Sequence, residues 1–249
     1  MRLFPVPWDW FKGQSHPKYQ VVELDVVKHV SDQRPESHRP RLDTVSVVGN
    51  LSSNSKRSAV LNRLPQPSMC ALVEGKGWSR TSLALVVPRQ VIDFEWEDNT
   101  GNAEHRKKML MAAQGSLLAQ DAPALEFCPF SFRLRYLCQA PSCNGHRQTI
   151  VDWEISEAWR KWRQMYPTDW LERIRQKWLG LVAPDRMPAF FVGNQKQAPQ
   201  GFLILGITRD IKPNESQPTD LFSEDTPRPP TGGTSTDQPQ NTEARLFDV

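Results

Sequence analysis

The sequence of 249 residues has little cysteine, no long apolar run and none of the common catalytic motifs. Four cysteines are too few for a disulfide scaffold, and a reducing compartment favours metal ligation or burial over bridging. No apolar run reaches 18 residues and the start "MRLFPVPWDW" lacks a signal-peptide pattern, so we expect a cytoplasmic protein with no membrane span. The strings GxxxxGKS/T, GxGxxG, GxSxG and HExxH are also missing, which argues against common nucleotide-binding, hydrolase and zincin chemistries.

Charge is divided unevenly along the chain. Residues 212–249 carry three basic and seven acidic residues, six prolines and only two aromatics, so they bury too little apolar surface to offset the entropy of ordering. We predict a disordered acidic tail there. Residues 1–211 then carry 28 basic and 21 acidic residues, a net charge of +7, which suits a polyanionic partner or is ordinary surface charge.

The apolar pattern predicts an α+β fold with a mixed or antiparallel sheet, because strands and helices do not alternate strictly. Strands are expected at 19–30, 44–49, 82–88 and 91–98, and no fixed-period repeat indicates a solenoid. "FSFRLRYLC" (130–138) alternates cleanly and "HRQTIVDWEI" (146–155) follows it, which predicts a β-hairpin with the loop "QAPSCNG". A second hairpin is expected from "AFFVGN" and "GFLILGI".

Helices are predicted at 55–64, 68–78, 104–120, 156–166 and 167–182, with Pro167 in the first turn of the last. A polar stretch near residue 100 divides the chain into a β-rich subdomain at 1–100 and an α+β subdomain at 101–211, followed by the tail at 212–249. One continuous α+β domain is an equally good interpretation of residues 1–211.

Several strings together resemble a family of bacterial proteins of unknown function whose genes lie in mobile-element and defence regions. They are "RLFPVP", "KYQVVELDV", "RPES", "FRLRYLC" with "CNGH" and "DWE", and "FFVGN", and they extend over residues 2–209. The resemblance implies an upstream strand segment with a cysteine, which does not precede "RLFPVP" in this sequence. It supplies no activity, so the chemistry must be argued from the residues.

Two cysteines and a histidine crowd the loop of the first predicted hairpin. Cys138, Cys143 and His146 have the spacing C-x4-C-x2-H, which supplies three zinc ligands as in zinc knuckles. Cys128 would lie about 33 Å from Cys138 along an extended strand, so the fourth ligand would be water or a residue from elsewhere. A structural zinc is the favoured metal hypothesis, and an open fourth position would make the site catalytic. The alternative is that the cysteines are merely buried and His146 caps the turn.

Paired carboxylates suggest a second chemistry. On a strand, Asp152 and Glu154 would share one face with Arg133 and Arg135 of the partner strand. Such a face is either a salt-bridged surface or, with His146, the start of a Mg²⁺-dependent nuclease or phosphodiesterase site. "DFEWE" repeats the arrangement with three further carboxylates: Asp93, Glu95 and Glu97.

Basic residues interleave with tryptophans between positions 159 and 178, a mixture that suits nucleic acid. The candidate phosphate-contacting residues are Arg133, Arg135, Arg147, Arg160, Lys161 and Arg163. The tryptophans are spaced three or four residues apart, which favours burial in the core over stacking on bases.

Two shorter features remain. The loop "RPES" holds Arg34 and Glu36, either as a structural turn in which they pair or as a ligand-contacting loop. The tail ends "EARLFDV", and its Leu246 and Phe247 weakly resemble a docking peptide that binds a protein partner.

Three functions follow from these features. The favoured hypothesis is a nucleic-acid-associated binding or assembly module with a structural zinc, without enzymatic activity. The rival is the Mg²⁺-dependent nuclease on Asp152 and Glu154. A protein-interaction adaptor acting through the tail is the third.

Overall fold

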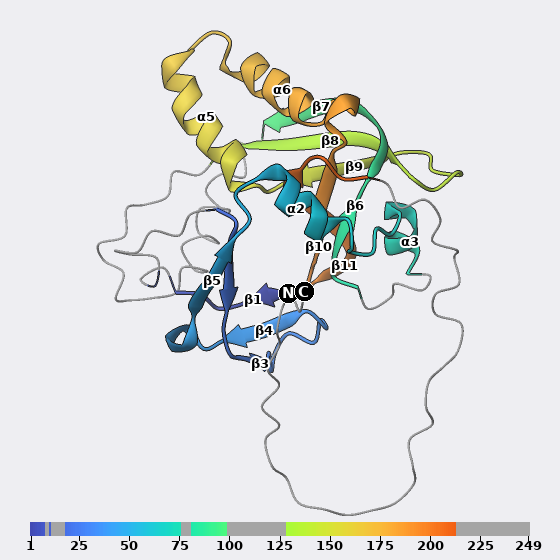
Figure 1. The fold of residues 1–249 in the computed structure, drawn as a ribbon. Helices are drawn as coiled ribbons and strands as arrows, with labels where there is room; N and C mark the ends of the chain where they lie inside the picture. The colour runs from blue at the N-terminus through green and yellow to red at the C-terminus, as the bar shows by residue number, and fades with distance from the viewer. Residues whose placement is uncertain (8–9, 11–17, 76–80, 99–127, 213–249) are drawn as a thin grey trace, which may run out of the picture. The chain divides into compact units, whose positions relative to one another are not determined.

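The computed structural model describes residues 1–7, 10, 18–75, 81–98 and 128–212. It confirms the α+β class: within these residues the chain forms three β-sheets and four α-helices (Figure 1). The chain divides into two compact units, which we call the N-terminal unit (residues 1–57) and the C-terminal unit (residues 58–212). The helix predicted at 104–120 and the predicted tail from residue 213 onward lie outside the described residues.

The N-terminal unit contains two small sheets. The first has the order β1-β4-β3, and the second pairs β2 with β5. The strands are β1 (Arg2–Leu3), β2 (Gln20–Glu23), β3 (Val26–Lys28), β4 (Ser37–Pro40) and β5 (Ser46–Asn50), with a 3-10 turn at Leu42–Thr44.

The single strand expected over 19–30 is therefore two strands in different sheets. The chain changes direction at Asp25, whose backbone N–H donates to Thr44 Oγ1 (2.9 Å) and whose carbonyl accepts from the Arg41 N–H (2.9 Å). These bonds take Asp25 out of the ladder. The "RPES" loop ends at Ser37, which is the first residue of strand β4.

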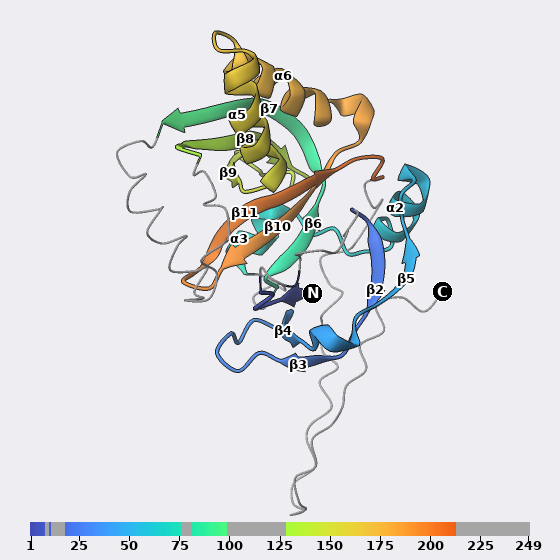
Figure 2. The same cartoon turned by 90° about the vertical axis from the view of Figure 1, so that its left-hand side faces the viewer.

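The C-terminal unit is built on a six-stranded sheet of order β6-β10-β11-β9-β8-β7 (Figure 2). Neighbours are antiparallel except β9 and β11, which run parallel. Its strands are β6 (Leu83–Val86), β7 (Pro88–Asp98), β8 (Phe130–Cys138), β9 (His146–Ile150), β10 (Ala189–Gln195) and β11 (Ala198–Thr208). Both predicted hairpins, β8-β9 and β10-β11, are confirmed.

Strand pairing joins residues on both sides of position 100. β7 pairs with β8 along nearly its whole length, from Pro88↔Cys138 to Asp98↔Phe130. These residues therefore share one sheet. The two compact units divide between residues 57 and 58, inside helix α2 (Asn54–Leu61).

Three further helices belong to the C-terminal unit: α3 (Met69–Glu74), α5 (Trp153–Met165) and α6 (Trp170–Leu181). Figure 1 shows α5 and α6 as a helical pair beside β7 and β8. Pro167 lies in the turn before α6, ahead of the N-cap residue Asp169, and not in its first turn as predicted.

The core of the C-terminal unit is large and mostly apolar. Alternate residues of β8 point into it, and α5 and α6 add one buried tryptophan each. Its largest fully buried side chains include Trp178, Tyr136, Phe94, Phe132 and Phe190. No helix in the described ranges is both long enough and apolar enough to span a membrane.

Candidate metal centre

Four side chains with metal-binding atoms converge at the tip of the β8-β9 hairpin. They are Cys70, Cys138, Cys143 and His146, and their ligand atoms all lie within 4.8 Å of one another. The Cys70 and Cys138 Sγ atoms are 3.6 Å apart, and Cys70 Sγ lies 3.4 Å from His146 Nε2. A tetrahedral zinc with Zn–S bonds of 2.3 Å separates its sulfurs by about 3.8 Å. The cluster therefore fits a zinc ion, and within the described residues it is the one group of this kind.

The hairpin positions three of the four ligands. Cys138 is the last residue of β8 and His146 the first of β9, while Cys143 lies in the loop between them, where its N–H donates to the Ala140 carbonyl (3.1 Å). Gly145 has φ +111°, a conformation that side-chain-bearing residues rarely adopt, so the loop can turn back only with glycine there.

Helix α3 supplies the fourth ligand. Ser68 caps its first turn by accepting from the Ala71 N–H (3.1 Å), and Gly75 ends it in the left-handed conformation. Met69, fully buried, anchors the helix and receives the Gln148 side-chain N–H on its sulfur (3.3 Å). These contacts hold Cys70 at the hairpin tip.

A buried polar network joins this anchor to the sheet. The Gln148 amide also donates to the Phe202 carbonyl (3.1 Å) and accepts from the Tyr136 hydroxyl. Tyr136 pairs with His146 in the strand register, and their rings are 5.5 Å apart. The residues surrounding the ligands are thus fixed by packing and hydrogen bonds, as metal sites require.

Two of the cysteine sulfurs receive hydrogen bonds from backbone N–H groups. Cys143 Sγ accepts from the backbone N–H groups of Cys138 and Gly145, each at 3.4 Å. Burial works against ionisation of Cys138, but hydrogen bonds from the backbone of Cys70 and Ala140, together with those from the Cys143 and Cys70 side chains, lower the Cys138 pKa. Burial and then the neighbouring Cys138 raise the pKa of Cys70 to about 12. Zinc binding at these residues would require the cysteines to lose their protons.

The arginines of the hairpin form a charge ladder with β7. Arg133 pairs with Glu97, whereas Arg135 (3.4 Å) and Arg147 (2.6 Å) share Glu95. The alternating carboxylates of "DFEWE" therefore face the alternating arginines of "FRLRYLC" across the antiparallel ladder. Asp93, the third carboxylate of the ladder, forms an ion pair with Arg175 of α6 (3.0 Å).

The basic residues of α5 are also mostly engaged. Arg160 pairs with Glu157, Arg163 lies over the Trp159 ring at 4.4 Å, and Lys161 is exposed. Trp159 and Trp178 are buried, while Trp162 and Trp170 pack against the core. The interpretation of the tryptophan spacing as core packing is confirmed.

Asp152 and Glu154 do not lie on a strand, so the predicted carboxylate pair on a sheet face is wrong. β9 ends at Ile150, and Asp152 is the N-cap of α5, its carboxylate accepting from the Glu154 N–H (2.9 Å). Aspartate directly before an apolar helical pattern is a strong N-cap signal, and it overrode continuation of the strand. Neither residue belongs to the metal cluster with His146.

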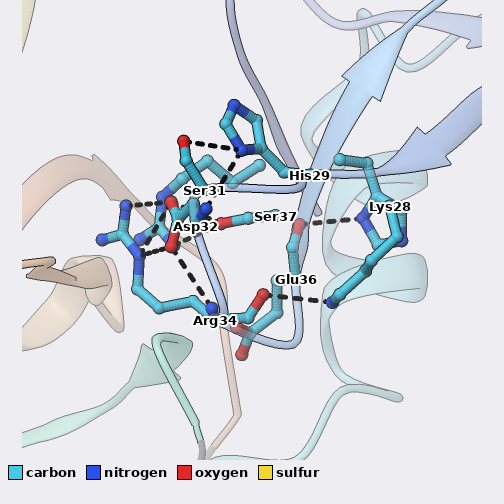
Figure 3. A network of polar contacts seen from close by, with 9 residues as sticks. Lys28, His29, Ser31, Asp32, Arg34, Glu36 and Ser37 are labelled. Atoms are coloured by element: carbon cyan, nitrogen blue, oxygen red, sulfur yellow. Dashed lines mark hydrogen bonds and ion pairs between the residues drawn. The ribbon is translucent and has the colours of Figure 1, made fainter.

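The "RPES" loop of the N-terminal unit is a hydrogen-bonded turn (Figure 3). Arg34 pairs with Asp32: its Nε and Nη2 atoms lie 2.8 and 2.6 Å from the carboxylate. Ser37 donates to the same carboxylate (2.9 Å), and Lys28 Nζ donates to the carbonyls of Arg34 and Pro35. These hydrogen bonds hold the Asp32 pKa well below its usual range, although burial opposes them.

Comparison with known families divides the chain at nearly the same place as the structure. Residues 65–226 match the model described as "Domain of unknown function (DUF8757)", more than half of the chain, and residues 1–63 match "Domain of unknown function (DUF8758)". The chain belongs to the DUF8757 family. All four candidate ligands lie inside the DUF8757 match. No curated protein and no solved structure matches the chain.

Proposed function

We propose that this chain is a non-enzymatic binding or assembly protein whose DUF8757 domain holds a structural zinc. The observation that carries the proposal is the convergence of four soft ligands, three thiolates and an imidazole, from a helix and a hairpin. A complete Cys3His set fills the tetrahedral preference of zinc and leaves no position for an activated water. Zinc would then join α3 to the β8-β9 hairpin, in the manner of a cross-link.

The ligand set is tested by metal analysis of purified full-length protein. We expect one zinc per chain, lost in Cys70→Ser and in Cys138→Ser. Cys128→Ser is the matched control, because Cys128 lies outside the cluster and its thiol faces the Phe130 carbonyl (3.7 Å). Zinc retained in full by Cys70→Ser would refute the four-ligand site.

Nucleic acid is the partner class we propose. Its support is the net charge of +7 over residues 1–211 and the excess of arginine on the charge ladder, where Arg135 and Arg147 share one carboxylate and are about half exposed. An incompletely neutralised guanidinium can still contact phosphate. The resemblance to proteins encoded in mobile-element and defence regions is compatible with this class.

A salt titration tests the nucleic-acid proposal. Binding to single- and double-stranded DNA and RNA should weaken steeply between low and physiological salt. Arg135→Gln with Arg147→Gln should lower the slope of log affinity against log salt by about 2. Lys196→Gln, a change at an exposed turn, is the control. Affinity that ignores salt, or a slope that the double variant leaves unchanged, would contradict phosphate contact.

A further inference from the structure

The four candidate ligands differ in their exposure to solvent. Cys138 and Cys143 are buried, at 0% and 7% exposure, whereas Cys70 and His146 are partly exposed. An oxidant arriving from solvent therefore meets Cys70 before the other two sulfurs.

Backbone hydrogen bonding distinguishes the same cysteine. Cys143 Sγ accepts two backbone N–H bonds. Cys70 Sγ instead contacts the side chains of two other candidate ligands, His146 Nε2 at 3.4 Å and Cys138 Sγ at 3.6 Å. Because exposure favours oxidation of a cysteine, the partly exposed Cys70 is the sulfur that an oxidant attacks first.

A partner sulfur already lies in contact with it. Cys138 Sγ is 3.6 Å from Cys70 Sγ, so a disulfide of ordinary length, about 2.05 Å, needs an approach of roughly 1.5 Å. The two residues are 68 positions apart, on α3 and β8. The resulting bond would hold α3 against the sheet by a covalent link in place of metal ligation.

We propose that Cys70 and Cys138 form a reversible disulfide on exposure to a hydroperoxide and that this reaction expels the zinc. The proposal rests on the structural zinc site proposed above. In the first step the Cys70 thiolate attacks the peroxide, an S–O bond forms, the O–O bond breaks, and the alkoxide or hydroxide takes a proton from water. In the second step the Cys138 thiolate attacks the Cys70 sulfur, an S–S bond forms, and the S–O bond breaks to release hydroxide.

The electrons balance, since the two sulfurs together lose two electrons and the peroxide gains two. The site then keeps only Cys143 and His146, too few ligands to hold zinc firmly. Thiol reductant and added zinc reverse the change.

The experiment exposes zinc-loaded full-length protein to hydrogen peroxide. Released zinc is followed with a chromogenic chelator, and peptides are mapped by mass spectrometry without reduction. We expect one zinc released for each Cys70–Cys138 cross-link, with both reversed by reductant and zinc. Cys128→Ser should behave as wild type, and Cys70→Ser should give no cross-link to Cys138.

The outcomes separate this inference from the proposal beneath it. Protein purified without zinc would refute the structural zinc site, and peptide mapping of that protein would still decide the disulfide pair. Protein that holds zinc but keeps it under peroxide, ends in sulfinic acid, or joins Cys138 to Cys143 would overturn the inference while leaving the zinc site intact.

Discussion

The two units of this chain are stabilised by different means. In the C-terminal unit, large apolar side chains from a six-stranded sheet and two helices share one core, and the metal cluster lies at its edge. In the described part of the N-terminal unit, the buried residues are Asp32, Ser37 and Pro40. Several of its valines are exposed instead, among them Val47 at 60%.

This difference shows that a small β unit can take its order from polar contacts. Burial of apolar area contributes most of the stability of a typical domain, and the described part of the N-terminal unit has little of it. Its described residues do form the Asp32 hydrogen-bond network and the strand pairing around it. The two units should therefore respond to different perturbations.

Loss of zinc should have the largest effect, and only in the C-terminal unit. Removing zinc by chelation, or by Cys70→Ser, separates α3 from the hairpin and should lower the free energy of unfolding by about 4 kcal/mol or more. Chemical denaturation of the zinc-loaded and zinc-free protein measures this difference in the free energy of unfolding. Equal stability of the zinc-loaded and zinc-free forms would mean that the metal does not support this unit.

Trp178→Ala should come next, because Trp178 is 1% exposed in the apolar core. The cavity left behind should cost about 3–5 kcal/mol of unfolding free energy. Val47→Ala in the N-terminal unit is the matched truncation and should change stability by less than about 0.5 kcal/mol. If both truncations cost the same, the contrast between the units is wrong.

Asp32→Asn should weaken the N-terminal unit by about 2 kcal/mol at neutral pH, since it removes the charge that Arg34 and Ser37 contact. The folded Asp32 pKa lies below its ordinary value, so the carboxylate stabilises the fold above about pH 4 and loses this effect as the pH falls toward the folded pKa. Hydrogen exchange of the β1 and β4 amides in the full chain measures this loss of stability, and the amides should exchange faster in the variant. A variant whose deficit persists unchanged at low pH would exclude this ion pair as the cause.

Two glycines of the C-terminal unit should give small effects of opposite sign. A Cβ on Gly193 would lie 2.7 Å from Leu205 Cδ1 and 3.0 Å from Leu83 Cδ2, so these side-chain ends must move. Because they are flexible and Leu205 is 41% exposed, Gly193→Ala should cost no more than about 1 kcal/mol. Gly180 in α6 has nothing within 4 Å of that position, so Gly180→Ala should add about 0.5–1 kcal/mol. Thermal unfolding measures both, and the same sign for both would contradict these packing arguments.

Local patterns predicted much of this structure. The alternation of "FSFRLRYLC" was sufficient for the β8-β9 hairpin, and the hairpin was sufficient to gather Cys138, Cys143 and His146. The end of strand β9 before Asp152 was missed because the residues around Asp152 fit a continuing strand as well as a helix N-cap. Only the helical pattern of the residues that follow distinguishes the two.

Cys70 could not be placed from the sequence, because it lies 68 residues before Cys138 and reaches the site only through the tertiary packing of α3. Elimination could have indicated Cys70. The hairpin lacked a fourth ligand, Cys128 was too distant, and Cys70 was the remaining cysteine. The short capped helix "SMCALVEG" that presents it was predicted, but its contact with the hairpin depends on the buried Met69–Gln148 contact.

X-ray absorption at the zinc edge of purified full-length protein tests the central claim most directly. The four-ligand site predicts one zinc per chain with three sulfurs at about 2.3 Å and one imidazole nitrogen at about 2.0 Å, and one sulfur fewer in Cys70→Ser if any zinc is retained. Zinc bound through two sulfurs in the wild-type protein, or a sulfur count that Cys70→Ser leaves unchanged, would contradict the account.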